Sequence, residues 1–223
     1  MILAAGRGER MRPLTDGTPK PLLIVGGKRL IEYHLEAVRK AGVREVVINL
    51  SWHGSQISDA LGDGSRCGVK IRYSDEGPVA LETGGGIFRA LDLLGPEPFI
   101  VINGDVWSDY VPSRLALPED AQARLVLVKN PPHHPKGDFG LEQGRVQRDG
   151  PVRYTFSGIA MYRPEFFNGC APGKFPLLPL FHRAIDAGVL AGEVHDGRWY
   201  DIGTPERLAT LDAELAAERL GTG

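Results

Sequence analysis

Cysteine is scarce in this sequence of 223 residues, which contains only Cys67 and Cys170. Two thiols so far apart in the chain form neither a disulfide framework nor a four-cysteine zinc site. The six histidines also lack the spacing of metal ligands with a cysteine or carboxylate partner. We therefore expect reduced, structural cysteines and no structural zinc.

Long hydrophobic runs and a strong excess of one charge are also missing. The apolar opening turns glycine-rich at Gly6, too early for a secretory signal, and no later run reaches the length of a membrane span. The 26 Lys and Arg residues nearly balance 28 Asp and Glu residues, which leaves no field suited to a polyanion. We expect a cytoplasmic protein that binds neither nucleic acid nor membranes.

Strand-like and helix-like segments alternate along the chain, which predicts a doubly wound, Rossmann-like α/β fold with a mostly parallel sheet. After Asn130 a proline-rich segment leads into short, glycine-separated segments that favour a small antiparallel section. We see no repeat and no linker, so we expect a single domain over residues 1–223. The predicted strands cover residues 1–5, 45–50, 69–73, 99–103 and 125–129, and the predicted helices residues 29–40, 53–61, 86–94, 177–187 and 205–219.

The N-terminal segment LAAGRGERMRPLT, residues 3–15, is a strand that runs into a glycine-rich turn. Gly6 and Gly8 allow backbone N–H groups to approach a polyphosphate closely. Met11 stands where a dinucleotide fingerprint needs its third glycine, and no Walker-type string occurs anywhere in the chain. The segment predicts a phosphate-binding loop of another kind, and the alternative is a plain surface turn.

Three charged side chains follow in positions that suit an anionic substrate. Lys20 stands between two prolines that restrict its backbone, although it could equally be a solvated lysine in a rigid turn. Asp105 follows the most apolar predicted strand, where ligands of open α/β sheets bind, and Asp201 precedes the last predicted helix. One or two carboxylates suffice for Mg²⁺ that substrate phosphates also hold. The alternative for both aspartates is the formation of a turn beside glycine.

Taken together, four separated motifs in this order make the chain resemble the sugar-1-phosphate nucleotidylyltransferases: residues 3–15, PKPL at 19–22, GD at 104–105 and DIGT at 201–204. The resemblance implies a nucleotidyltransferase fold that binds a nucleoside triphosphate and Mg²⁺. Within the family, residues 81–87, 104–107 and 137–139 look most like the bacterial N-acetylmuramate α-1-phosphate uridylyltransferases.

The resemblance also implies a role for particular residues. Ala5, Gly6, Gly8 and Arg10 would surround the nucleotide, with Arg10 and Lys20 on its phosphates as catalytic groups together with Asp105. Asp105 and Asp201 would hold Mg²⁺, Asn103 would lie near the ribose, and the base would bind at Glu82, Thr83, Gly84 and Gly85. Sugar hydroxyls would meet Asp138 and, more weakly, Glu142 and a turn at residues 155–158 that contains Gly158. The alternative for Asp138 is an exposed loop carboxylate.

The implied reaction is attack of a sugar 1-phosphate on the α-phosphorus of UTP, which needs no general base because a phosphate monoester has a second pKa of about 6. We expect UTP and N-acetylmuramic acid 1-phosphate as substrates, with Lys136 or Arg153 as the cation for the lactyl carboxylate. The alternatives are glucose or mannose 1-phosphate with UTP, dTTP or GTP, and a catalytically silent nucleotide-sugar sensor. The chain ends soon after its last predicted helix and leaves no room for the C-terminal extensions of many relatives, so we expect a monomer.

Overall fold

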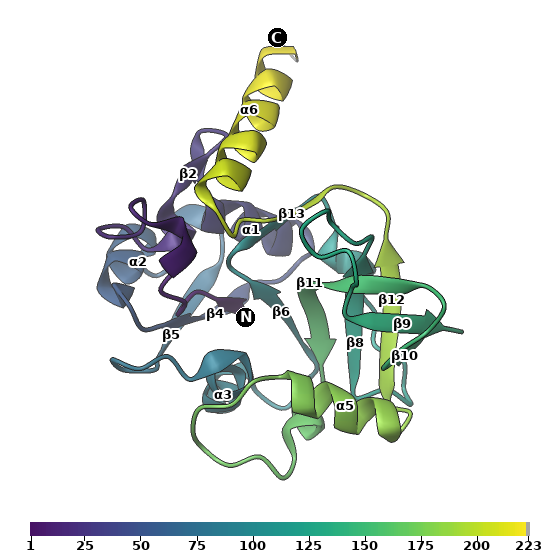
Figure 1. Cartoon of the computed structure of the whole chain (residues 1–223). Helices are drawn as coiled ribbons and strands as arrows, with labels where there is room; N and C mark the ends of the chain where they lie inside the picture. The colour runs from purple at the N-terminus through teal and green to yellow at the C-terminus, as the bar shows by residue number, and fades with distance from the viewer. Residues whose placement is uncertain (222–223) are drawn as a thin grey trace.

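The computed structural model describes residues 1–221, which contain a nine-stranded sheet with helices on both faces (Figure 1). The first half of the sheet is parallel throughout, in the order β5-β4-β1-β6. Its strands are β1 (Ile2–Leu3), β4 (Glu45–Leu50), β5 (Lys70–Asp75) and β6 (Phe99–Asn103). The predicted parallel α/β arrangement is confirmed for this half.

Side chains alternate between two apolar layers along these strands, as a pleated sheet requires. Ile2, Ile48 and Ile102 face the cluster that contains α1 (Leu30–Lys40) and α2 (Gly54–Leu61). Leu3 and Val101 face the opposite cluster. That second layer contains α3 (Glu82–Arg89), α4 (Leu91–Leu94) and α5 (Leu178–Asp186). The doubly wound layering therefore follows directly from the alternating apolar pattern.

The second half of the sheet is mixed, so the sheet as a whole is not mostly parallel, whereas the small antiparallel section expected after Asn130 is confirmed by the pairing of β9 with β10 and β11. The strands follow in the order β6-β11-β8-β12-β10-β9, and only the β8–β12 pair is parallel. Because β9 also pairs with β11, these five strands close into a small barrel-like ring. They are β8 (Ala123–Val128), β9 (Phe139–Glu142), β10 (Arg145–Gln147), β11 (Arg153–Tyr162) and β12 (Leu190–His195).

The expected turn at residues 155–158 is also wrong, because these residues lie inside β11, the longest strand. The ladder between β11 and β8 shifts register between Phe156 and Ile159. Gly158 lies within this bulge at a φ of 79°, a conformation that favours glycine. The glycine that suggested a turn thus bends a continuous strand.

The last helix, α6 (Pro205–Gly221), projects from the molecule near the C-terminal end (Figure 1). The Thr204 hydroxyl accepts a hydrogen bond from the Arg207 backbone N–H at 3.4 Å and so caps the start of α6. Leu208, Leu211 and Leu215 form a buried stripe along α6 and pack in one cluster with Met11 and Trp107. Two short ribbons complete the fold, β2 (Ile24–Val25) with β3 (Lys28–Arg29) and β7 (Val106–Ser108) with β13 (Trp199–Asp201). Within the described residues, no helix combines the length and the apolar character needed to cross a membrane.

We predict that burial of His34 in α1 makes the fold sensitive to mild acid. Burial lowers the pKa of His34 from 6.5 to about 4, and its Nε2 atom has no hydrogen-bond partner within the described residues. Since the unfolded chain binds the proton more tightly, stability is lost as the pH falls from 6.5 toward 4, by at most about 3 kcal/mol. Urea unfolding at several pH values measures this slope. His34→Gln should flatten it, and an unchanged slope in that variant would assign the acid sensitivity to other groups.

Candidate functional site

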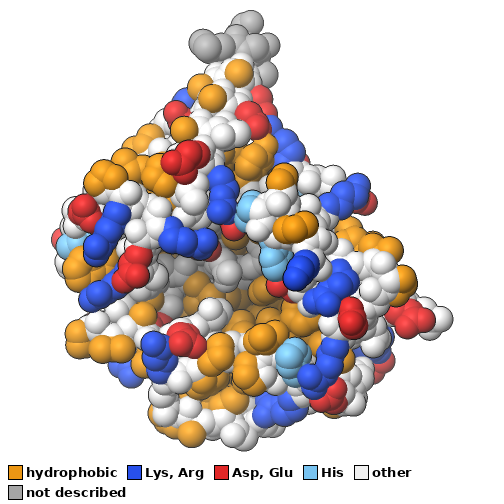
Figure 2. All heavy atoms as spheres, in the orientation of Figure 1, with side chains coloured by type: hydrophobic (Ala, Val, Ile, Leu, Met, Phe, Trp, Pro, Cys, Tyr) orange, Lys and Arg blue, Asp and Glu red, His pale blue; other side chains and the backbone are white. Residues whose placement is uncertain are grey.

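A pocket of about 480 Å³ opens at the carboxyl ends of the parallel strands. Its walls come from the loop after β1, the start of α3 and the turn between β6 and β7. In the space-filling view it forms the hollow at the centre of the molecule (Figure 2). This is the position where open α/β sheets bind their ligands.

The glycine-rich loop bends through Gly8, which has a φ of 64° and begins a short 3₁₀ helix over Glu9–Met11. The Thr15 hydroxyl fixes this bend by donating to the Gly8 carbonyl oxygen at 2.8 Å. Gly6 differs, because a Cβ atom built there would meet no protein atom within 4 Å. Ala5, Gly6, Gly8 and Arg10 all line the pocket, as expected of a phosphate-binding loop.

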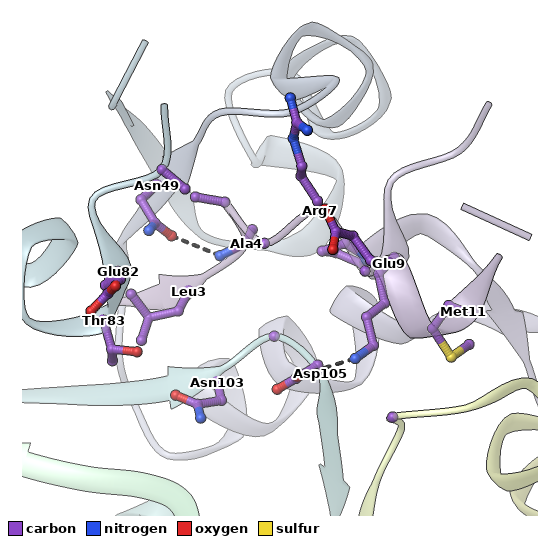
Figure 3. A pocket seen from close by; sticks show the side chains of 18 of the residues that line it. Leu3, Ala4, Arg7, Glu9, Met11, Asn49, Glu82, Thr83, Asn103 and Asp105 are labelled. Carbon is purple, nitrogen blue, oxygen red and sulfur yellow. Dashed lines mark hydrogen bonds and ion pairs between the residues drawn. The ribbon is translucent and has the colours of Figure 1, made fainter. Parts of the chain in front are cut away.

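Lys20 and Asp105, which both line the pocket, form an ion pair, marked by the dashed line at Asp105 in Figure 3. The Lys20 ammonium lies 3.0 Å from Asp105 Oδ2. The Lys20 side chain is 9% exposed and that of Asp105 is 47% exposed, so the lysine is buried while the carboxylate stays open to the pocket. A buried ammonium needs such a partner, because an unpaired buried charge is strongly destabilising.

The turn that carries Asp105 is held tightly against β1. The Gly104 N–H donates to the Leu3 carbonyl oxygen at 2.8 Å, and a Cβ atom at Gly104 would collide with that oxygen. On the other side, the Ile202 N–H donates to the Asp105 carbonyl oxygen at 2.7 Å. The two expected metal ligands, Asp105 and Asp201, therefore lie on adjoining backbone segments.

The Asp201 carboxylate itself is occupied by other side chains. It forms an ion pair with Arg207, and His133 Nε2 lies 3.2 Å from its second oxygen. Burial and the nearby charges of Arg207, His134 and Arg10 lower the pKa of His133. Asp201 does not line the pocket, although Gly203 two residues later does.

The expected base-binding residues separate into two groups. Glu82 and Thr83, at the start of α3, line the pocket. Gly84 and Gly85 are buried and do not line it. A Cβ atom at either glycine would collide with residues 173–175, so these glycines allow that segment to pack on α3. The helix starts at Glu82 rather than at the predicted residue 86 and includes all three glycines.

The expected sugar-binding residues lie in and around the barrel-like half. Asp138 accepts hydrogen bonds from the Phe156 N–H at 2.8 Å and from His134 Nε2 at 3.0 Å. Glu142 ends β9 and is exposed. Gly158 packs against the pocket residue Asn103, because a Cβ atom there would lie 2.8 Å from Asn103 Nδ2. Asn103 and Gly158 are thus brought together, while Asp138 and Glu142 do not line the pocket.

The two expected cations for a lactyl carboxylate lie in different surroundings. Arg153 donates to the carbonyl oxygens of Gly137 and Asp138 and to the Asp149 carboxylate. The Arg153 guanidinium is therefore already engaged by hydrogen bonds within the protein. Lys136 is exposed on the same loop.

Sequence reasoning missed two buried polar residues that line the pocket, Asn49 and Glu76. Asn49 is the second-last residue of β4, and Glu76 directly follows β5. Their position at the carboxyl ends of parallel strands was a usable signal, since polar side chains there face the ligand site. Neither residue belongs to a recognisable motif, which is why both escaped notice.

The composition of the pocket suits charge neutralisation and positioning. Arg7, Arg10 and Lys20 supply cations, and the lining within the described residues contains no Ser, Cys, His or Tyr. Nowhere in residues 1–221 do three or more His, Cys, Asp or Glu side chains gather as a metal cluster. Such a site can bind a polyphosphate and align two anions for transfer.

The fold and this site define a nucleotidyltransferase: residues 1–149 match the profile of the nucleotidyl transferase family, and the chain belongs to that family. The resemblance expected from the four motifs is confirmed.

Two relatives share nearly their whole length with this chain, and both are named N-acetylmuramate alpha-1-phosphate uridylyltransferase. The protein of Neisseria meningitidis serogroup B is 50% identical over 226 residues, which cover 97% of this chain and 98% of the relative. The protein of Caulobacter vibrioides is 34% identical over 237 residues, which cover 97% and 96%. A solved structure from Bacillus anthracis, assigned as a glucose-1-phosphate thymidylyltransferase, superposes with a TM-score of 0.84 over 96% of this chain and 94% of that one. At 20% identity this last likeness concerns the fold alone.

We predict that Gly6 and Gly8 serve different purposes. Gly6→Ala should leave the free energy of unfolding within about 0.5 kcal/mol of the parent and weaken nucleotide binding about tenfold or more, because its methyl group enters space that only a ligand fills. Gly8→Ala should destabilise the fold by about 1–2 kcal/mol, because φ is positive and Thr15 is close. Urea unfolding and titration calorimetry with UTP measure the two effects.

Gly17→Ala serves as the matched control, since a Cβ atom there also meets open space but Gly17 does not line the pocket. If Gly6→Ala bound UTP as tightly as Gly17→Ala, the loop would not approach the phosphates.

Proposed function

We propose that the protein transfers the uridylyl group of UTP to N-acetylmuramic acid 1-phosphate, giving UDP-N-acetylmuramic acid and pyrophosphate. The observation that carries this proposal is the 50% identity with the Neisseria uridylyltransferase over almost all of both chains. The reaction belongs to the recycling of peptidoglycan sugars. A nucleoside triphosphate is a cytoplasmic substrate, so we propose the cytoplasm as the compartment of the reaction.

The residues of the chain act on charge and position. Arg10 and Lys20 contact the triphosphate and stabilise the charge that develops on pyrophosphate as it leaves. The 1-phosphate of the sugar is already largely ionised near neutral pH, so it attacks the α-phosphorus without a general base. The loop at Ala5, Gly6 and Gly8 presents backbone N–H groups to the triphosphate and keeps the two reactants aligned.

Asp105 fits the role of a Mg²⁺ ligand. Its carboxylate is half exposed to the pocket and only one of its oxygens is held by Lys20, so a hard oxygen donor stays available. Asp201 would be the second ligand, and in this structure its carboxylate is paired with Arg207 and His133. When bound, Mg²⁺ supplies positive charge to the α-phosphate and to the attacking phosphate.

The two substrates would meet at the junction of the halves of the sheet. Glu82 and Thr83 border the base, with Gly84 and Gly85 shaping the helix behind them, and Asn103 lies near the ribose. Gly158 lets β11 pack directly against Asn103, and the acceptor sugar would bind on the barrel-like side of this contact. Asp138 and Glu142 face sugar hydroxyls, and the exposed Lys136 meets the lactyl carboxylate.

The test is pyrophosphate release, with Mg²⁺ present, from UTP, dTTP, GTP and ATP combined in turn with the 1-phosphates of N-acetylmuramic acid, N-acetylglucosamine, glucose and mannose. We predict a maximum at UTP with N-acetylmuramic acid 1-phosphate. Asp105→Asn should lower that turnover at least about a hundredfold, because the pocket loses its open carboxylate charge.

A maximum at another pair would overturn the substrate assignment. Nucleotide binding without pyrophosphate release from any pair would instead favour a silent sensor. Asp59→Asn in α2, an exposed carboxylate outside the pocket, is the control for the loss of one negative charge.

A further inference from the structure

Asn49 and Glu76 form a buried polar chain between two walls of the pocket. Asn49 Oδ1 accepts a hydrogen bond from the Ala4 N–H at 2.7 Å, and Asn49 Nδ2 donates to Glu76 Oε1 at 2.6 Å. Glu76 Oε2 then accepts from the Leu81 N–H at 2.7 Å. The chain thus runs from the loop after β1 to the residue before α3, and the Asn49 and Glu76 residues are only 3% and 8% exposed.

The two backbone groups at the ends of this series of hydrogen bonds fix the order of its donors and acceptors. Ala4 and Leu81 both offer backbone N–H donors, so the side-chain pair must present an acceptor at each end. An amide followed by a carboxylate meets this demand, with the single amide donor in the middle. Two amides or two carboxylates would leave like groups facing each other in a buried site, which is costly.

The series of hydrogen bonds from Ala4 through Asn49 and Glu76 ends at a strained turn. Glu82, the first residue of α3, has a φ of 61°, which is unfavourable for a residue with a Cβ atom. Leu81 before it is held from both sides, by Glu76 at its N–H and by the Phe175 N–H, which donates to the Leu81 carbonyl oxygen at 3.1 Å. The hydrogen bonds that Leu81 makes with Glu76 and Phe175 therefore hold the turn in this strained conformation.

Helix α3 also rests directly on the polar pair. A Cβ atom at Gly86 would collide with Glu76 Oε1 and lie 3.1 Å from Asn49 Nδ2. Glycine at this position lets the helix backbone settle on the amide and the carboxylate. Asn49, Ala4, Glu82 and Thr83 accordingly lie around one side of the pocket (Figure 3).

We propose that Asn49 and Glu76 are positioning residues that set the spacing between the phosphate loop at Ala4–Gly6 and the nucleotide wall at Glu82–Thr83. The pair determines how tightly the nucleotide binds and which base is preferred, and it has little influence on the acceptor sugar. This inference rests on the proposed function in one respect, that the ligand between these walls is the nucleotide.

A swap of the two side-chain chemistries tests the proposal. In Asn49→Asp two carboxylates face each other. In Glu76→Gln an amide donor faces a backbone N–H donor, either that of Ala4 or that of Leu81. The double variant Asn49→Asp/Glu76→Gln restores the order, because the carboxylate at 49 accepts from Ala4 and from the new amide, whose oxygen accepts from Leu81. It also keeps the net charge of the parent.

Titration calorimetry of the full-length variants with UTP, dTTP, CTP and GTP gives the nucleotide affinities, and initial rates give KM for UTP and for the sugar 1-phosphate. We expect each single variant to weaken UTP binding about tenfold or more, to reduce the preference for UTP and to leave KM for the sugar within about twofold. The double variant should recover UTP affinity to within about threefold of the parent. The swap Glu165→Gln/Asn168→Asp, at two exposed residues, is the matched control and should change nothing.

Single variants with parental UTP affinity would overturn the proposal, and so would a folded double variant that binds UTP as weakly as the weaker single variant. If the single variants fail to fold, the UTP affinity of the double variant alone decides in the same way. If the parent prefers another nucleotide to UTP, the uridylyl assignment fails, while the same affinity ratios measured on that nucleotide still test the positioning role.

Discussion

The ion pair between the buried Lys20 and the half-exposed Asp105 joins the two parts of the chain on which the site depends. Lys20 follows the glycine-rich loop, while Asp105 lies on the turn after the central strand β6. Because the ammonium is almost fully buried, its charge must be balanced locally, and the carboxylate that balances it is the one that opens into the pocket. The pair thus fixes the loop against the sheet and leaves one acidic oxygen available.

The other segments that line the pocket also meet at the carboxyl end of β1. Strand β1 is only two residues long, yet it lies between β4 and β6, so the loop that follows it leaves from the middle of the sheet. Gly104 packs directly on the Leu3 carbonyl oxygen, which brings the Asp105 turn against that loop. After the barrel-like half, the chain forms β13, which pairs with β7 as a separate ribbon and places the Asp201 backbone next to Asp105. The parallel half therefore carries the residues that we propose to bind the nucleotide, and the mixed half adjoins them where the proposed acceptor would enter.

Much of the parallel half could be predicted from the sequence because each element there has a local signal. Strands β4 and β6 match their predicted ranges, and α1 differs by one residue, since apolar alternation or helical periodicity defines them. Strand β11 was mistaken for a turn because Gly158 serves a bulge, which local sequence does not distinguish from a bend. Helix α3 was placed too late because its glycines weaken helix propensity, whereas packing against residues 173–175 requires them. Motifs placed Lys20 and Asp105 together in the pocket, but the Arg207 and His133 partners of Asp201 depend on contacts between distant segments.

The proposed function makes one claim about the reaction that can be tested directly: the sugar phosphate attacks the α-phosphorus of UTP itself, with no nucleotidyl group carried by the protein. The most direct measurement uses UTP in which sulfur replaces one non-bridging oxygen of the α-phosphate, so that the α-phosphorus has a known configuration. The configuration of the product gives the stereochemical course of transfer. A single in-line displacement inverts that configuration, and inversion is the result we predict. Retention of configuration would mean two displacements through a covalent nucleotidyl-enzyme, with Lys20 as the first side chain to examine, and would contradict the account.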